Sequence, residues 1–116
     1  DKMGYTNHWY HKKPFTDVEW AIIKNEYKYI VNNFNNVLIK DQTEDQNEIR
    51  FDGIDKNSHE TFVLKKINDL KPMYEGDDVT YHFCKTNRKP YDIVVRHILR
   101  YANHINDDKL SLRFED

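Results

Sequence analysis

Residues 79–98 read VTYHFCKTNRKPYDIVVRHI, and the hydrophobic periodicity changes within this stretch. From Val79 to Phe83 apolar residues alternate with polar ones, which is typical of a β-strand. From Tyr91 onward apolar residues recur every three or four positions, which is typical of an amphipathic helix. A chain that passes from strand to helix within so few residues is expected to combine both elements in one fold.

A second helical pattern lies earlier in the chain and carries its own start signals. Thr16 and Glu19 have the spacing of a capping box, and Phe15 and Trp20 have that of a hydrophobic staple. These signals predict a helix over residues 17–34. Its buried face is expected to comprise Trp20, Ile23, Tyr27, Ile30, Val31 and Phe34.

Short alternating or apolar segments predict six strands, at residues 3–11, 37–39, 48–54, 62–65, 79–84 and 110–114. Within 79–84 we expect Tyr81 and Phe83 to face the core and His82 to face away, since successive strand residues point to opposite sides. Residues 68–78 are expected to form a loop, and Pro90 to occupy the first position of the second helix. The order β, α, β, β, β, β, α, β predicts a single α+β domain over residues 1–116. A two-layer sandwich of a mostly antiparallel sheet and two amphipathic helices would bury every apolar face.

Composition narrows the class of protein. The chain has 116 residues, 14% of them aromatic, so we expect a folded domain. The net charge of −2 argues against a protein that coats nucleic acid nonspecifically. Cys84, the single cysteine, excludes an internal disulfide and suits a reducing compartment. No membrane span or signal peptide is visible, so the expected location is the cytoplasm, and Asp1-Lys2 are expected to precede a native start at Met3.

The best candidate site is the junction between strand and helix. Three cations, Lys85, Arg88 and Lys89, lie at this junction. They stand beside a helix start whose free backbone N–H groups favour an anion. The candidate ligand-binding residues are His59, Glu60, Cys84, Lys85, Thr86, Asn87, Arg88 and Lys89. The alternative is a solvated basic loop with a capping side chain.

Other constellations are weaker. His82 and Cys84 could donate two metal ligands, but no second close pair completes a four-ligand site, so no metal and no other cofactor is expected. Cys84 is flanked by aromatic residues and is expected to be a small buried hydrophobe, although a neighbouring lysine would activate it if it were exposed. No catalytic residue is assigned. Aromatic rings near the N-terminus could stack on bases, or could belong to the core.

Three parts of the sequence carry a resemblance. They are MGYTNHW at residues 3–9, FDG with SHETF at 51–53 and 58–62, and FCKTNRKPYD at 83–92. Together they resemble a family of short bacteriophage and prophage proteins with a Met-Gly-Tyr-Thr start, a His-Glu-Thr-Phe segment and a Cys-Lys-Thr…Lys-Pro-Tyr-Asp segment. His8 stands where that family has an aromatic residue. The resemblance implies a phage product made in bacterial cytosol, and the motifs point to no particular chemistry.

We therefore expect a non-enzymatic phage binding protein, with an anti-defence role as one form of it. Its ligand would be a signalling nucleotide or an acidic surface of a host protein. One alternative is a small enzyme acting on a phosphorylated or nucleotide substrate, with His59 as acid–base and Lys85 or Arg88 holding the anion. Another is a structural protein whose exposed apolar residues form a homo-oligomer interface.

Overall fold

The computed structural model describes residues 5–68 and 79–115. The predicted loop over 68–78 lies, apart from Asn68, outside the described residues, as do the expected additions before Met3. The elements are β1 (Thr6–His11), α1 (Asp17–Phe34), β2 (Lys40–Asp41), β3 (Glu48–Asp52), a 3₁₀ turn η1 (Asp55–Asn57), β4 (Phe62–Lys65), β5 (Thr80–Lys85), α2 (Asp92–Ile105) and β6 (Leu110–Phe114).

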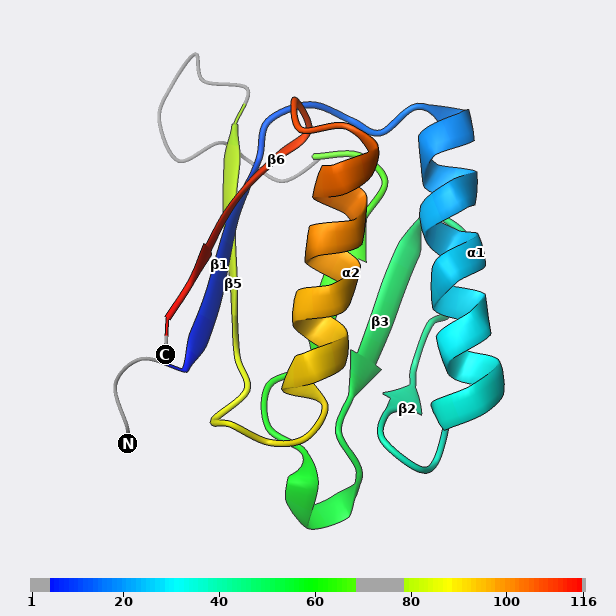
Figure 1. Ribbon diagram of the computed structural model, residues 1–116, viewed down its shortest axis with the longest axis vertical. Coiled ribbons are helices and arrows are strands. Elements are labelled where there is room, and N and C mark those ends of the chain that lie inside the picture. Colours follow the sequence, from blue (N-terminus) through cyan, green and yellow to red (C-terminus); the bar gives the residue numbers. More distant parts are fainter. Residues whose placement is uncertain (1–4, 69–78, 116) are drawn as a thin grey trace.

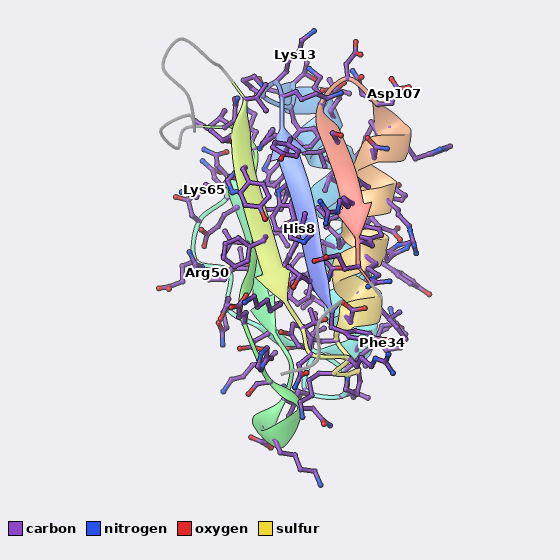
Figure 2. The ribbon with its side chains drawn as sticks, turned by 90° about the vertical axis from the view of Figure 1, so that its left-hand side faces the viewer. His8, Lys13, Phe34, Arg50, Lys65 and Asp107 are labelled. Atoms are coloured by element: carbon purple, nitrogen blue, oxygen red, sulfur yellow. The ribbon has the colours of Figure 1, made fainter. Side chains whose placement is uncertain are left out.

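Within residues 5–68 and 79–115, six strands form two antiparallel sheets of three strands each, with the orders β5-β1-β6 and β2-β3-β4. Helices α1 and α2 lie side by side and run in opposite directions (Figure 1). In the view onto β1, the sheet β5-β1-β6 lies in front of the helices and presents its other face outward (Figure 2). The α+β class is therefore confirmed, with the strands divided between two sheets.

Helix α1 begins where its sequence signals place it. The Thr16 side chain accepts a hydrogen bond from the Glu19 amide (3.1 Å), and the Glu19 carboxylate accepts one from the Thr16 amide (2.9 Å). The rings of Phe15 and Trp20 stack with their centroids 5.9 Å apart, which completes the staple. The predicted bounds of 17–34 are confirmed. Phe34 is an exception to the predicted face, since its side chain is largely exposed at the end of the helix.

One hydrophobic core joins both helices to both sheets. The rings of Trp9 on β1 and Phe62 on β4 lie 5.3 Å apart and connect the sheets. Helix α2 covers the sheets with the predicted stripe, of which Val94, Val95, Ile98 and Ala102 are buried. Burial of large apolar side chains of this kind is the dominant favourable term in folding.

The predicted strand at residues 37–39 is wrong. Residues 36–38 form a turn with Val37 exposed, and the strand is β2, at Lys40–Asp41. An Asn side chain stabilises this arrangement, because Asn35 Oδ1 accepts a hydrogen bond from the Asp41 amide (3.0 Å). Apolar side chains alone could not reveal a turn held by an Asn carbonyl.

The predicted facing of β5 is also wrong. Phe83 is 50% exposed, while Cys84 is buried and His82 faces inward. The cause is the register against β1, which pairs His82 with Trp9. Residues directly opposite one another share a face of the sheet. Since Trp9 points into the core, His82 stacks on it at 5.6 Å, and Phe83 lies on the outer face.

Candidate functional site

The predicted junction is a tight turn. The Lys89 amide donates to the Thr86 carbonyl (2.9 Å), and the two residues between them, Asn87 and Arg88, have φ of 51° and 59°. This is the hydrogen bonding and backbone hand of a type I′ turn. Asn tolerates the left-handed region, whereas Arg at the second central position adopts it at a cost of about 1 kcal/mol. The Arg88 guanidinium lies over the Tyr5 ring at 3.8 Å.

The start of α2 already holds an anion, the carboxylate of Asp92. Asp92 Oδ1 accepts hydrogen bonds from Asn7 Nδ2 (2.7 Å) and Thr86 Oγ1 (2.5 Å). Asp92 Oδ2 pairs with Arg96 Nε at 3.0 Å, and both side chains are mostly buried. The protein's own carboxylate therefore occupies the place that we expected for an external ligand.

The first amides of α2 are engaged as well. The helix begins at Asp92, so Pro90 lies two residues before it and not at its first position. The Asp92 amide donates to the Lys89 carbonyl (2.9 Å), and the Ile93 amide to the Pro90 carbonyl (3.4 Å). These short-range bonds use N–H groups that an anion at a helix start would need.

The two predicted halves of the site do come together. The Glu60 carboxylate accepts a hydrogen bond from the Lys85 amide (2.7 Å), and the Glu60 carbonyl accepts one from the Tyr91 hydroxyl (2.6 Å). The Cys84 thiol also donates to the Glu60 carbonyl, at 3.5 Å. These contacts hold the 58–60 segment against the end of β5. The polar groups that converge here are thus used to join elements of the fold.

The remaining predicted residues divide into buried and exposed groups. Cys84 and Thr86 are buried, and burial raises the pKa of the Cys84 thiol, which opposes its use as a nucleophile. His59 is exposed, and its amide donates to Asp52 Oδ1 (3.0 Å). The exposed cations, Lys85 and Arg88, stand at the solvent side of the turn.

A second candidate surface is the outer face of the sheet β5-β1-β6. Its rows follow from the strand register, which places Phe83, His8 and Arg113 opposite one another and Tyr81, Tyr10 and Ser111 in the next row. Lys85 lies on β5, two residues beyond Phe83 and on the same face. We call this set, namely Thr6, His8, Tyr10, Tyr81, Phe83, Lys85, Ser111 and Arg113, the outer face.

Aromatic rings form a connected patch on the outer face. Tyr81 lies between the other two, with its centroid 5.3 Å from that of Tyr10 and 6.0 Å from that of Phe83. Tyr10 is 44% and Phe83 is 50% exposed. Large apolar surface gathered on one side of a small protein commonly marks an interaction site.

His8 lies at the centre of this face (Figure 2) and bridges two polar side chains. The Tyr81 hydroxyl lies 2.5 Å from His8 Nδ1, and Glu115 Oε1 lies 2.5 Å from His8 Nε2. The contact with His8 lowers the pKa of Glu115. Burial raises the pKa of Tyr81, so its phenol retains its proton. The bridge fixes the rings of His8 and Tyr81 in a stacked pair, 5.8 Å apart.

A groove on the opposite side of the molecule has a different character. It has a volume of about 360 Å³ and lies between α1 and the β2–β3 region. Lys24 and Lys28 line one part of it, and Asp41 and Glu48 another. Cations and carboxylates in one groove do not favour an anionic ligand, and none of the predicted site residues lines it.

Sequence reasoning found the cations of the junction and missed the outer face. The signal was present, because Thr6, His8 and Tyr10 alternate with residues of the buried face of β1. The position of Phe83 could not be found in this way, since its apolar character favoured the core and only the pairing with β1 places it outside.

Searches of protein-family models, of curated proteins and of solved structures find no match for this chain. The resemblance to short phage proteins therefore stays a prediction. Among residues 5–68 and 79–115, no three His, Cys, Asp or Glu side chains are grouped so that they could hold a metal ion. Neither helix of this part of the chain has the length and apolar character that crossing a membrane requires.

Proposed function

We propose that this chain is a non-enzymatic binding protein for a nucleotide-containing ligand, which lies on the outer face. The observation that carries the proposal is the coincidence of half-exposed rings and exposed cations on one side of a sheet. Phe83 and Tyr10 can stack on bases, and stacking on an aromatic ring contributes about 1–3 kcal/mol per base. Arg113 lies in the row of Phe83, Lys85 lies in the adjacent row opposite Thr6, and both cations can pair with phosphate.

Charge supports this assignment. The chain as a whole carries a net charge of −2, whereas the outer face and the adjacent turn carry the exposed cations Lys85, Arg88 and Arg113 against the carboxylate of Glu115. A local positive region on a slightly acidic protein attracts anions without causing nonspecific binding of anions to the rest of the surface. A phage product that captures a signalling nucleotide in bacterial cytosol is the form of this function that the sequence resemblance favours.

The test is to map the binding surface by NMR with ATP and a cyclic dinucleotide as probes. We expect amide shifts confined to β5, β1 and β6, and their loss in Phe83→Leu. The matched control is Tyr29→Leu, because Tyr29 is 62% exposed but lies on α1. Absence of shifts with either probe at millimolar concentration, or equal loss in both variants, would refute the proposal.

A small enzyme acting on a nucleotide substrate is the second candidate. The hydrogen-bonded side chains of Tyr81, His8 and Glu115 follow one another as a hydroxyl, a base and an orienting carboxylate. The raised pKa of Tyr81 weighs against an activated phenol. Turnover of a nucleotide panel by wild type, lost in His8→Gln, would establish the enzyme. Native mass spectrometry separates the remaining alternative, since a ligand-free oligomer would indicate an assembly protein.

A further inference from the structure

We infer that the ligand of the outer face is a single-stranded nucleic acid segment and not a free mononucleotide. This inference rests on the proposed function. A mononucleotide has one base and engages one aromatic platform. The outer face offers two exposed platforms, Phe83 and Tyr10, which lie in different rows and on different strands. Tyr81 lies between them and closes the gap, so that one aromatic surface extends across both rows.

The spacing of the platforms suits neighbouring bases. Phe83 on β5 and Tyr10 on β1 are diagonal neighbours across the strand pair, a relation that places side chains about 7–8 Å apart. This separation is comparable with that of unstacked bases in an extended strand. Sheet surfaces with aromatic residues in adjacent rows bind single-stranded segments in this manner, with bases splayed on the rings.

The cations lie where a backbone that follows the two platforms would pass. Lys85 follows Phe83 by two residues and lies on the same face of β5, and Arg88 follows in the turn. Arg113 lies across the sheet, in the row of Phe83 and His8. Lys85 and Arg88 lie at one edge of the aromatic patch, and Arg113, whose guanidinium also pairs with Glu115 Oε2 at 3.3 Å, lies at the other. Cations at both edges fit a ligand with a phosphate on each side of a base better than a ligand with phosphates at one end.

Polar groups beside the rings can contact base edges. The hydroxyls of Tyr10 and Ser111 belong to one row of the outer face, whereas both ring nitrogens of His8 are already bonded to Tyr81 and Glu115. No helix or strand of the described residues crosses in front of β1 on this side (Figure 2). A duplex would not suit this surface, because its bases are stacked inside and are not available to the rings.

Few cations imply a short site and a weak dependence on salt. Three phosphate contacts correspond to a slope of log K against log salt of about −2 for a single strand. This agrees with a chain whose net charge of −2 disfavours nonspecific coating of nucleic acid. The inferred partner is thus a segment of a few nucleotides, held mainly by stacking.

The experiment is fluorescence anisotropy with labelled oligothymidylate and oligouridylate of about ten nucleotides, a length within the range of known single-strand sites. Competitors are thymidine monophosphate, uridine monophosphate and a hairpin duplex of the same length. We expect both oligonucleotides to bind, and the monophosphates to compete at least about 100-fold more weakly, since they lose one stacked base and all but one of the phosphate contacts. The difference between the DNA and RNA strands tells which of the two is preferred.

Variants locate the site. Phe83→Leu and Tyr10→Leu should each weaken oligonucleotide binding about 10-fold, the effect of losing one stacked base. Tyr29→Leu removes a ring from α1 that is more exposed than Phe83 or Tyr10, and it should leave binding unchanged. Urea unfolding of each variant verifies that it is folded.

The outcomes separate the two proposals. Monophosphates that compete as well as the oligonucleotides would overturn the inference of a strand and leave the proposed nucleotide function intact. Equal binding of the duplex, or equal weakening by Tyr29→Leu, would also overturn the inference. If neither monophosphates, cyclic dinucleotides nor oligonucleotides bind, both proposals fail.

Discussion

Replacement of Asp92 by alanine removes the carboxylate that occupies the start of α2. Wild type offers this carboxylate three donors, from Asn7, Thr86 and Arg96. Asn7 and Thr86 are fully buried, so neither can turn to water when its acceptor is lost. Arg96 keeps two other partners, Asn7 Oδ1 (2.9 Å) and the Glu115 carbonyl (2.9 Å), which limits the damage.

The magnitude follows from these contacts. Removal of one partner of a buried ion pair costs about 3–5 kcal/mol. Because Arg96 retains two acceptors, we expect the lower end, a loss of about 3 kcal/mol in the free energy of unfolding. Urea denaturation followed by fluorescence of the buried Trp9 and Trp20 measures this loss. Asp92→Asn keeps one acceptor oxygen and should cost less than the alanine variant.

In Asp92→Ala, the site left by the Asp92 carboxylate should bind an external carboxylate. Formate at ten times its dissociation constant would restore about 1.4 kcal/mol to Asp92→Ala by mass action. The control is Asp17→Ala, which removes an acidic residue from the first turn of α1. The Asp17 side chain is 91% exposed, so its loss should cost little and formate should have no specific effect. A loss below about 1 kcal/mol for Asp92→Ala, or equal stabilisation of all three proteins by formate, would refute the idea of an intramolecular anion.

Further predictions concern β5, the thiol and acid stability. Phe62→Ala should cost about 4 kcal/mol because its ring is buried, whereas Phe83→Ala should cost about 1 kcal/mol; equal losses in urea unfolding would contradict the outer position of Phe83. Cys84 should resist iodoacetamide in the folded protein at pH 8 and react fully in urea, as mass spectrometry would show, because burial raises its pKa. The pKa of Glu115 is lowered in the folded state, so its carboxylate contributes stability at neutral pH that is lost as pH falls through the lowered pKa. His8→Ala should raise that pKa in an NMR titration, and an unchanged value would exclude the His8 contact as its cause.

Local rules predicted the parts of the fold that depend on neighbours in sequence. The Thr16–Glu19 cap and the Phe15–Trp20 staple are contacts within one turn, and they fix the start of α1 without reference to the rest of the chain. The stripe of α2 is likewise set by spacing alone. Such elements are predictable because the groups that determine them lie a few residues apart.

The facing of β5 depended on the pairing of His82 with Trp9, which lies 73 residues earlier in the chain. Two registers were open to an alternating segment, and a shift of one residue moves every side chain to the other face. Phe83 favoured one register by its apolar character. The pairing of His82 with Trp9 decided for the other, because Trp9 fills the inner face. Composition of a single strand cannot supply that information.

The junction shows why distinctive residues need not be ligand-binding residues. Gly53 illustrates the point, since a Cβ there would lie 2.1 Å from the Asn57 carbonyl oxygen and 2.8 Å from Tyr91 Cδ1. Only glycine permits this approach of the FDG segment to Asn57 and to Tyr91, the residue before α2. Glu60 in the SHETF segment and Asp92 in the FCKTNRKPYD segment are likewise held by contacts within the protein.

These residues therefore join the two sheets to α2, and their chemistry is used in doing so. A carboxylate that already accepts hydrogen bonds from a buried Asn and a buried Thr has little capacity left for a ligand. Recognition is better sought where side chains are rigidly placed and still open to solvent. Phe83 and Tyr10 meet both conditions, because strand pairing fixes their backbone and about half of each side chain remains exposed. The framework built by the distinctive segments thus holds β5 against β1 in the register that turns these rings outward.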